Sequence, residues 1–350
     1  MEKTQPTLKD LAERLNLSVG TVQRALNNKG GYKPETQRRV LEEAEKIGYT
    51  VNPAASALRR PPVSIAVVLP EPIDHNKYFY QYVWQGIEYA YKELAVFQVG
   101  YQKMFIHPHS SDFCDVLEQL SASDKIQGII TVLNRDARFD DIMRRFAQRG
   151  IPVSFINAGN TLNDTRFSVS TGGLAADILA STHTSVPGQV LLLGGSYENE
   201  LHRRRAMDFS QKLREYCANI SVLEIHEYHD LKKLRGTIAS MLKNLDTLTG
   251  IFSVSTRETL CMCQAVSEMG FSGKMMTIGV DAFPELLPFF QNGTLTSSIY
   301  HYPTRLAYSV FYQLVSQLTS IPTPYVVQSI PAVPIFRSNA DFFCKAEGII

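Results

Sequence analysis

The residues with the clearest chemistry near the start of the chain lie in the stretch LSVGTVQRALNNKG, Leu17–Gly30. If this stretch is helical, its outward face presents Gly20, Gln23 and Arg24. An arginine can donate two hydrogen bonds to a guanine edge, and a valine such as Val19 can contact the methyl group of thymine. Small and hydrogen-bonding groups on one helix face are therefore typical of a surface that base edges and phosphates approach closely.

Three short helices are predicted to position this face. Thr7 is typical of a helix start, and Ser18 is placed to cap a second helix that runs through Leu26. Pro34 favours the first turn of a third helix and Gly48 favours its end. Helix, turn, helix, loop and helix within ~45 residues is the helix-turn-helix layout, whose second helix enters the major groove. A generic three-helix bundle with a solvated face is the alternative. The positions expected to face inward are Leu8, Leu11, Ala12, Leu15, Thr21, Val22, Ala25, Leu26, Val40, Leu41, Ala44 and Ile47.

The distribution of charge supports a separate head. The chain has 350 residues and a net charge of +1, and a length of this order allows roughly two or three domains at ~100–200 residues each. Residues 1–60 hold 11 Lys and Arg against 7 Asp and Glu, which gives +4, and the remainder carries −3. A basic head on a mildly acidic body is typical of a nucleic-acid-binding module joined to another domain. No apolar run approaches the ~18 residues of a membrane span and the start lacks a signal-peptide core, so we expect a cytoplasmic protein without membrane contact.

From residue 63 onward, strand patterns alternate with helix patterns. The first series contains SIAVVLP, FQVGYQKMFI, IQGIITVL and IPVSFIN, and the second contains GQVLLLGG, ISVLEIHEY, GIFSVS and KMMTIGVD. Alternation of this kind predicts an α/β fold, and two series predict two lobes. Ligands in such folds bind beyond the carboxyl ends of the strands, which is where the candidate polar residues of this chain fall.

The sequence offers little support for catalysis or a metal site. Five cysteines are scattered along the chain, and Cys261 and Cys263 are two residues apart on a helical pattern, so they cannot both face one metal ion. We expect buried free thiols, no metal and no cofactor. The paired glycines of LLLGGSYE follow a strand without a G-x-G-x-x-G or P-loop pattern. No arrangement of nucleophile, base and orienting group is evident, so we do not expect an enzyme.

The head resembles the DNA-binding head of the lactose-repressor (LacI/GalR) family in its motifs LSVGTVQRALN, TQRRV and GYTVNPAASAL. The order of IPVSFIN, RRRAMDF, IGVD and GTLTSSIYHYP is also that of the family's effector domain. The resemblance implies an all-α helix-turn-helix domain over residues 1–50 and a hinge helix or linker over 51–62. It further implies an α/β two-lobed, periplasmic-binding-protein-like (type I) domain over 63–340, for effector binding and dimerisation.

The resemblance also assigns DNA contacts. Val19 and Gly20 would begin the recognition helix, and Arg24 would touch a base or phosphate. The segment NPAASALRR resembles the family's hinge helix, in which Leu58 would insert into the minor groove while Ala55 packs against its mate. A plain linker is the alternative, because a helix this short is marginal alone and Val51 stands where proline is usual. The full set is Thr7, Ser18, Val19, Gly20, Thr21, Gln23, Arg24, Asn27, Tyr32, Asn52, Ala55 and Leu58.

The effector contacts implied by the resemblance come from both lobes. Tyr78 and Phe79 match an aromatic pair that covers a sugar ring, although ordinary core aromatics are the alternative. Asp281 matches the family's most persistent effector-binding acid. His301 stands where a glutamine is common, and a solvated histidine is equally compatible with the sequence. The full set is Tyr78, Phe79, Asn157, Arg205, Ser255, Arg257, Asp281 and His301. Arg205 matches the arginine of the R–GF motif, in which Asp208 stands where glycine is common.

These residues predict a dimeric, ligand-responsive regulator that reads a pseudo-palindromic operator, most simply a repressor of carbohydrate or polyol catabolism. An acid, an amide and an arginine around an aromatic plate suit a neutral sugar or polyol. Arg203, Arg204 and Arg257 could instead pair with a phosphate or carboxylate. The alternatives are a cytoplasmic sugar-binding protein without DNA activity, a sugar-active enzyme with an accessory head, and a regulator that responds to a nucleobase or a phosphorylated metabolite. A C-terminus without heptads favours a dimer over a tetramer.

Overall fold

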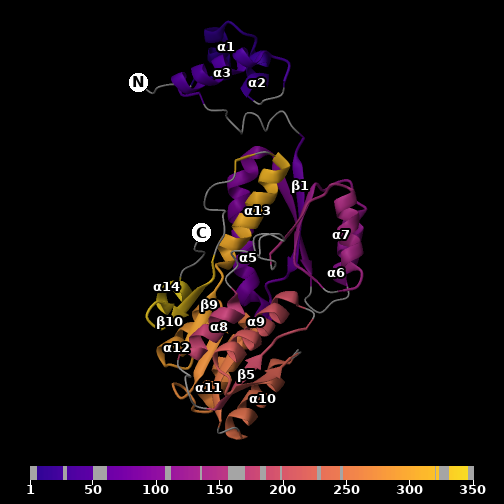
Figure 1. The fold of residues 1–350 in the computed structure, drawn as a ribbon. Helices are drawn as coiled ribbons and strands as arrows, with labels where there is room; N and C mark the ends of the chain where they lie inside the picture. The colour runs from indigo at the N-terminus through magenta and orange to yellow at the C-terminus, as the bar shows by residue number, and fades with distance from the viewer. Residues whose placement is uncertain are drawn as a thin grey trace. The chain divides into compact units, whose positions relative to one another are not determined.

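The computed structural model describes residues 6–26, 30–49, 61–106, 112–134, 136–156, 170–181, 187–197, 199–226, 230–244, 247–319, 321–322 and 331–345. The chain divides into two compact units, the first built mainly of Met1–Pro61 and the second of residues from Pro62 onward. Figure 1 shows the first unit as a group of short helices and the second as an α/β body. The predicted Asn27, Asn52, Ala55, Leu58 and Asn157 lie outside the described residues.

The first unit contains the three predicted helices, α1 (Leu8–Leu15), α2 (Val19–Leu26) and α3 (Pro34–Ile47). Thr7 caps α1 in a reciprocal box: its hydroxyl accepts from the amide of Asp10, and the Asp10 carboxylate accepts from the amide of Thr7. The helix ends at Asn16 in the left-handed conformation, with φ 54°, and α3 ends in the same way at Gly48.

The core of the first unit joins all three helices through small and medium apolar side chains. Its buried members are Leu11, Ala12, Leu15, Val22, Ala25, Val40 and Ala44. One inward position was predicted wrongly, because Leu41 is 48% exposed. Val40 occupies the inward position, and the next residue on a helix lies about 100° further round, so Leu41 faces solvent.

The second unit begins with a parallel sheet of four strands. These are β1 (Val63–Pro70), β2 (Val99–Ile106), β3 (Gly128–Thr131) and β4 (Val153–Phe155), in the order β2-β1-β3-β4. Nearly every residue of the central β1 is buried, as its continuous apolar sequence predicts for a parallel strand covered on both faces.

A second, six-stranded sheet follows in the order β10-β9-β8-β7-β5-β6. Its strands are β5 (Gly188–Leu193), β6 (Ile220–Ile225), β7 (Leu248–Ser253), β8 (Met276–Val280), β9 (Ser297–Tyr300) and β10 (Val333–Phe336). All neighbours pair in parallel except β10, which is antiparallel to β9. The two sheets confirm the predicted two-lobed α/β fold.

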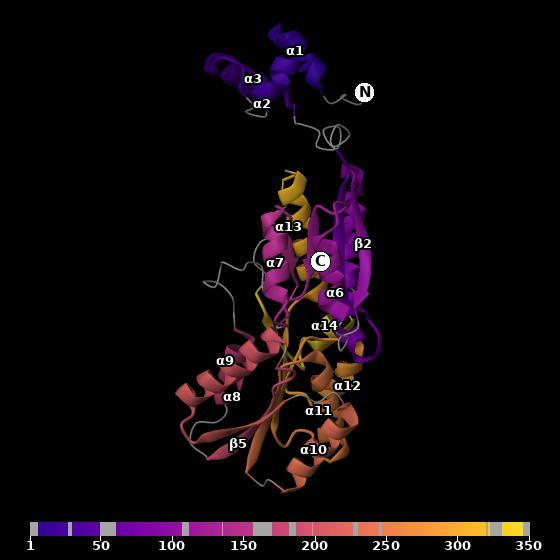
Figure 2. The same cartoon turned by 90° about the vertical axis from the view of Figure 1, so that its right-hand side faces the viewer.

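Helices cover both faces of the second sheet. One core cluster joins α8 and α9 to one face, and another joins α10, α11, α12 and α14 to the opposite face. Figure 2 shows α8 and α9 on one side of the strands and α10 and α11 on the other. The helices of the second unit are α5 (Lys77–Leu94), α6 (Asp112–Ser121), α7 (Phe139–Gln148), α8 (Thr171–Ala180), α9 (Glu200–Tyr216), α10 (Leu231–Asn244), α11 (Thr256–Glu268), α12 (Leu287–Gln291), α13 (Pro303–Thr319) and α14 (Ala340–Lys345).

The chain returns to the first lobe after β9 through α13, which packs along α5. The two helices approach so closely that a Cβ atom on Gly86 would lie 2.0 Å from the carbonyl oxygen of Thr304. A glycine at residue 86 is therefore required by the packing of α13, which ties the strands of the second sheet back to the first lobe.

All five cysteines are buried free thiols, as predicted: Cys114, Cys217, Cys261, Cys263 and Cys344. Within the described ranges, no helix has the length and apolarity needed to cross a membrane. The same ranges contain no cluster of three or more His, Cys, Asp or Glu side chains suited to a metal ion.

Candidate functional site

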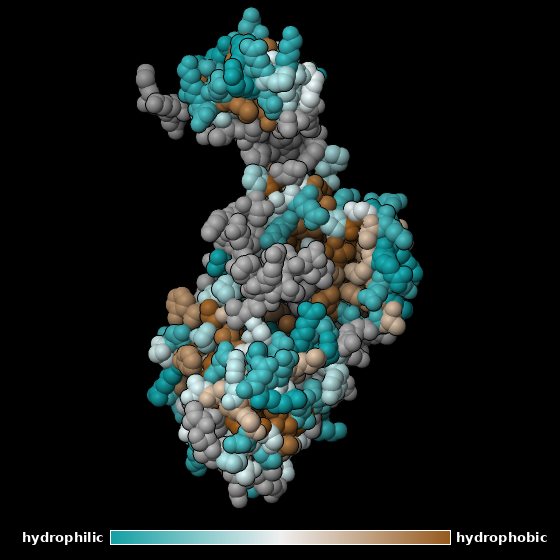
Figure 3. Space-filling view, viewed as in Figure 1, coloured by the Kyte–Doolittle hydropathy of each residue, from teal (hydrophilic) through white to brown (hydrophobic). Residues whose placement is uncertain are grey.

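The predicted DNA-reading face lies on α2 in the first unit. Val19 is 40% exposed, Gly20 and Arg24 are exposed, and Gln23 is half-buried. Figure 3 shows that much of the visible surface of this unit is hydrophilic. The outward side of α2 therefore presents an apolar side chain at Val19, a position without a side chain at Gly20 and a cation at Arg24.

Arg24 differs from Arg14 and Arg38 of the first unit in having no acidic partner among the described residues. Arg14 pairs with Glu43 and Arg38 with Glu42, whereas among the described residues no carboxylate lies at ion-pair distance from Arg24. The guanidinium group lies near Gly31, where an added Cβ would be 3.7 Å from Nη1. An exposed cation without a carboxylate partner in the described part of the chain is available to a phosphate or a guanine edge.

Ser18 and Thr21 bind each other instead of pointing freely outward. Their hydroxyl oxygens are 2.8 Å apart, and the Thr21 amide donates to the Ser18 hydroxyl over 3.1 Å. The Thr7 hydroxyl is likewise used by its cap. Tyr32 is half-buried against the core of the first unit. These members of the predicted set shape the helices in this structure, and their DNA contacts stay predictions.

The second candidate site lies at the carboxyl ends of β7, β8 and β9. Asp281 directly follows β8 and adopts φ 60°, a left-handed conformation that aspartate tolerates better than most residues. Its Oδ1 accepts from Nδ1 of His301 over 2.8 Å and from the His301 amide over 3.2 Å. Its Oδ2 accepts from the Thr256 hydroxyl over 3.1 Å. Both carboxylate oxygens are therefore engaged by groups of the protein.

His301 connects this carboxylate to Arg205 on α9. Because Nδ1 donates to Asp281, Nε2 carries no proton and acts as an acceptor. It accepts from Nη2 of Arg205 over 3.0 Å and from the Thr171 hydroxyl over 2.9 Å. The histidine that sequence alone could leave in solvent thus joins four elements, namely β8, β9, α8 and α9.

Arg205 is held in place by neutral acceptors. It is only 7% exposed, and its Nη1 donates to the carbonyl oxygen of Val254 over 2.8 Å. Its Nε has no hydrogen-bond partner. Asp208 stands where the R–GF motif commonly has glycine. Its side chain fits on α9 because the close approach of α8 and α9 is made by Gly172 on α8. A Cβ on Gly172 would lie 2.2 Å from the Arg205 carbonyl oxygen.

Burial and neighbouring charges set the protonation of this network. Burial lowers the pKa of His301, the charge of Arg205 lowers it further, and Asp281 acts in the opposite direction. Burial raises the pKa of Asp281, but His301, Arg205 and Thr256 outweigh burial and leave that pKa below its usual value. Burial lowers the pKa of Arg205 to about 10. At neutral pH the network therefore contains a carboxylate, a neutral imidazole and a guanidinium ion.

The other predicted effector residues have mixed surroundings. Ser255 caps α11 by accepting from the amide of Glu258, so its hydroxyl is used locally. Arg257 is half-buried in the next turn. Tyr78 is buried and stacks on Phe283 with ring centroids 4.3 Å apart, while Phe79 meets Tyr80 edge to face. In this structure Phe283 covers one face of the Tyr78 ring, which was predicted to cover a sugar ring.

The structure adds two residues that sequence reasoning missed. His202 lies one helical turn before Arg205, and its Nδ1 accepts from the amide of Ser196 over 3.3 Å. Burial, together with the charges of Arg205 and Arg257, lowers the His202 pKa to about 3. Glu258 is 3% exposed, and burial raises its pKa to about 7. The sequence signal that could have identified His202 is its i, i+3 spacing from Arg205, which places both side chains on the same face of α9.

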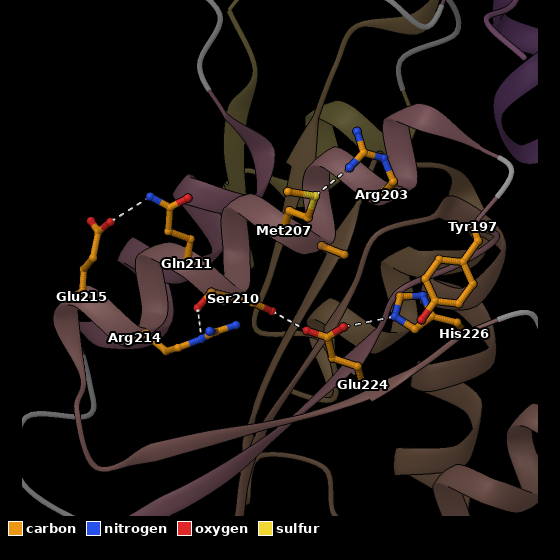
Figure 4. Close-up of a pocket in the computed structure, with 10 residues that line it drawn as sticks. Tyr197, Arg203, Met207, Ser210, Gln211, Arg214, Glu215, Glu224 and His226 are labelled. Carbon is orange, nitrogen blue, oxygen red and sulfur yellow. Dashed lines mark hydrogen bonds and ion pairs between the residues drawn. The ribbon is translucent and has the colours of Figure 1, made fainter. Parts of the chain in front are cut away.

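A separate hollow of about 580 Å³ lies between α9 and β6 (Figure 4). Its polar groups bind one another: Glu224 accepts from the Ser210 hydroxyl and pairs with His226, and Arg214 donates to the Ser210 carbonyl oxygen. Tyr197 stacks on His226 with centroids 4.0 Å apart. None of the predicted effector residues lines this hollow, so the strand ends remain the candidate effector site.

Comparison with protein families assigns both units. Residues 7–52 match the family described as bacterial regulatory proteins, lacI family. Residues 65–320, most of the chain, match the family described as periplasmic binding protein domain.

Characterised relatives match mainly through shorter segments. The chain is 34% identical to catabolite control protein A of Priestia megaterium over 83 residues, 23% of this chain and 24% of that protein. It is 46% identical to the probable transcriptional repressor ExuR of Bacillus subtilis over 52 residues, 15% of this chain and 16% of that protein. A longer match, 23% identical over 268 residues and 73% of each chain, is to the maltose regulon regulatory protein MalI of Escherichia coli. The matched part thus spans about a quarter or less of the first two relatives.

Solved structures share the fold of the second unit. GanP, a glucose-galactose binding protein of Geobacillus stearothermophilus, superposes with a TM-score of 0.66 at 21% identity, over 80% of this chain and 99% of its own. A putative LacI transcriptional regulator of Bacteroides fragilis superposes with a TM-score of 0.66 at 15% identity, over 81% of this chain and 100% of its own. The chain therefore carries a head that matches the lacI family of bacterial regulatory proteins, and over most of its length it belongs to the periplasmic binding protein domain family.

Proposed function

We propose that the protein is a cytoplasmic transcriptional regulator, most simply a repressor of carbohydrate or polyol genes. A small-molecule effector would set its affinity for operator DNA. The observation that carries the proposal is the exposed Arg24 on α2, a cation without an acidic partner among the described residues, on a family-matched helix-turn-helix unit. A second unit with a polar network at its strand ends supplies the place for the effector.

DNA recognition follows from the position of α2. A recognition helix lies in the major groove with its first residues at the base edges, where Val19 and Gly20 would meet the DNA. A homodimer would read a pseudo-palindromic operator, because the two-fold symmetry of the protein maps onto the symmetry of the site. The name of MalI, the maltose regulon regulatory protein, supports a regulatory role over carbohydrate genes, and that of ExuR, a probable transcriptional repressor, supports repression.

Effector control requires two arrangements of the lobes that hold the DNA-binding heads differently. An effector changes DNA affinity only by as much as its own affinity differs between these arrangements. Contacts that span the lobes, such as the stacking of Tyr78 on Phe283 seen in this structure, would be lost or altered in a second arrangement. The proposal assigns no chemical step to the bound molecule, in keeping with a family of regulators.

Selection from a random duplex library with the full-length protein, followed by gel-shift titration, tests the proposal. We expect a near-palindromic duplex to emerge and Arg24→Ala to lower its affinity by at least ~30-fold, since a base-reading arginine contributes about 1–3 kcal/mol in each half-site. The matched control is Arg38→Ala, an exposed arginine of α3 that pairs with Glu42. Failure of the protein to retain any duplex at low salt, with and without small molecules, would refute the proposal.

A further inference from the structure

A further hollow, of about 620 Å³, lies at the edge of the six-stranded sheet opposite the candidate effector site. It is lined by the first residues of β7 and β8, Leu248 and Met276, and by Arg337, which follows β10. Because β10 runs antiparallel to β9, its carboxyl end lies beside the amino ends of the parallel strands. Asp281 and His301 follow the other ends of β8 and β9, about 17 Å away along a strand of five residues. The hollow is therefore separate from the effector site.

The turn before β8 brings a lysine to this hollow. Gly273 adopts φ 71°, a left-handed conformation that glycine permits, and the amide of Lys274 donates to the Phe271 carbonyl oxygen over 3.0 Å. The Gly273 amide donates to the carbonyl oxygen of Gly293 over 3.0 Å, which joins this turn to the loop before β9. These backbone bonds fix the point at which the Lys274 side chain leaves the chain.

Two exposed cations line the hollow without a counter-charge from the described part of the chain. Neither Lys274 nor Arg337 forms an ion pair with a described carboxylate, whereas the exposed Arg235 of α10 pairs with Glu268. The ring of Phe271, centred 5.5 Å from the Lys274 ammonium, attracts that cation but does not neutralise it. No acidic side chain is found among the described residues that line the hollow. Its electrostatic character is therefore positive.

The rest of the lining is largely apolar. Met275, Met276, Phe290 and Leu295 contribute to the walls. Phe290 and Leu295 belong to the core of the second sheet, while Met275 and Met276 are half-buried. Methionine side chains adapt to partners of different shape, and the volume of the hollow lies within the range of about 300–1,000 Å³ that small-molecule sites occupy. Apolar walls beside two cations suit a molecule that has both an apolar and an anionic part.

We propose that this hollow is a second small-molecule site, which binds an amphipathic anion: an apolar chain or ring that carries a carboxylate or a phosphate group. The apolar part packs on the methionine side chains, and the anionic group pairs with Lys274 and Arg337. A neutral apolar molecule leaves both cations without a partner, and a purely polar anion leaves the apolar walls in water. The inference depends neither on DNA recognition nor on the identity of the effector.

Titration calorimetry on the full-length protein tests the inference with four probes: octanoate, octyl phosphate, octanamide and inorganic phosphate. Octanamide keeps the apolar chain without the charge, and inorganic phosphate keeps the charge without the chain. We expect both octyl anions to bind at least ~10-fold more tightly than either of these controls, and their comparison separates the two anionic groups. Equal binding of octanamide, or no binding of either octyl anion, would overturn the inference.

Methionine methyl resonances locate the bound molecule. In protein labelled with ¹³C at the methionine methyl groups, octanoate should shift the resonances of Met275 and Met276, which Met275→Leu and Met276→Leu assign. Met207 is 56% exposed on α9, away from this hollow, and its resonance should stay in place. Shifts of the same size at Met207 would show non-specific adsorption of the octyl chain and contradict a site at this edge of the sheet.

Variants test whether the two cations hold the anionic group. Lys274→Gln and Arg337→Gln should each weaken octanoate binding roughly 3- to 10-fold, and the double variant should bind octanoate no better than octanamide. Lys274→Arg keeps the charge and should bind as the unmodified protein does. Both side chains are exposed, so the fold should persist, and circular dichroism checks it.

The matched control is Arg235→Gln, which removes an exposed arginine of the same unit that pairs with Glu268. It should leave octanoate binding unchanged. A loss in this control equal to that in Arg337→Gln would mean that only the net charge of the unit matters. Unchanged binding in the double variant would mean that the cations take no part. Either result would refute the proposed site.

Discussion

The proposed DNA-reading face of α2 and the proposed effector edge of the second sheet hold their polar groups in opposite ways. On α2, Arg24 is exposed and has no acidic partner within the described residues, and Gly20 adds no side chain at all. At the effector edge, Asp281 is 2% exposed and His301 binds it through two hydrogen bonds. One region keeps its groups free in solvent, and the other fixes them in a buried network.

The difference is the one expected if α2 binds DNA and the strand ends bind a small effector, as proposed. DNA brings its own dense charge and is met by groups that are already exposed, so the protein gives up little stability to hold them ready. A small effector needs groups fixed in position before it arrives, and fixing charged groups in a low-dielectric interior is costly unless they bind one another. Substitutions should therefore separate stability from binding in the first unit and combine them in the second.

The largest expected effect is on Asp281→Asn. Asparagine tolerates the left-handed backbone at this position, where φ is 60°. Its oxygen can keep the two hydrogen bonds from His301, and its amide nitrogen can donate to the Thr256 hydroxyl, while the charge is lost. Arg205 would then lack even its indirect counter-ion, so we expect the free energy of unfolding of the second unit to fall by about 3 kcal/mol. Urea unfolding followed by the fluorescence of Trp84, the single tryptophan, measures the change.

Asp208→Asn is the matched control for that experiment. Asp208 is an exposed carboxylate that accepts from the Ser170 hydroxyl, and an asparagine oxygen can take its place. We expect a change within about 0.5 kcal/mol. Equal losses from Asp208→Asn and Asp281→Asn would mean that the network around Arg205 does not stabilise the second unit.

The next effect is a pair of opposed pH dependences of the second unit, one from a histidine and one from a glutamate. Residues 1–61 contain no histidine, so the histidine effect belongs to the second unit. The pKa of His202 is lower in the folded protein, so its contribution to stability is lost as the pH falls below the unfolded value of ~6.5. The pKa of Glu258 is raised to about 7 on folding, so its contribution grows over the same fall in pH. Each effect amounts to about 1–2 kcal/mol between pH 7 and pH 5.

Variants make these opposed effects visible. Glu258→Gln should become less stable at pH 5 than at pH 7, because the histidine contribution then acts without opposition. His202→Gln should lose less stability than the unmodified protein between pH 7 and pH 5, because only His301, whose pKa is also lowered on folding, then opposes Glu258. Unfolding by urea at the two pH values measures both. If both variants change with pH as the unmodified protein does, these two groups do not control the response.

Much of the fold was predictable from local sequence. The continuous apolar sequence of β1 predicts a strand buried on both faces, and the caps at Thr7 and Gly48 predict where helices begin and end. The exposure of Leu41 was not predictable from such rules, because Leu11 and Ala12 are adjacent on α1 and both buried, whereas of Val40 and Leu41 only Val40 is. The return of α13 to the first lobe depends on a close contact at Gly86 that no local pattern encodes.

The candidate effector site was predictable by position but not by interaction. The resemblance and the strand-end rule brought Arg205, Asp281 and His301 to one edge, and the structure does place them together. That they would bind one another, with His301 neutral between two charges, depends on distances across four elements. His202 was missed because its partner is a backbone amide of a loop rather than a side chain. Tertiary geometry decides such contacts, and spacing in sequence does not.

The smallest expected effect sharpens the comparison most, because its two readouts should change in opposite directions. An added Cβ on Gly20 meets only the Ser18 hydroxyl, at 4.0 Å, so Gly20→Ala is accommodated in the free protein. Alanine favours a helix by about 1 kcal/mol over glycine, and the first unit should gain roughly that much stability. If Gly20 exists to let DNA approach the backbone, the same substitution should weaken operator binding. Amide hydrogen exchange of α2 peptides and gel-shift titration measure the two effects, and a variant that is both more stable and equally tight on DNA would show that the open position serves no recognition.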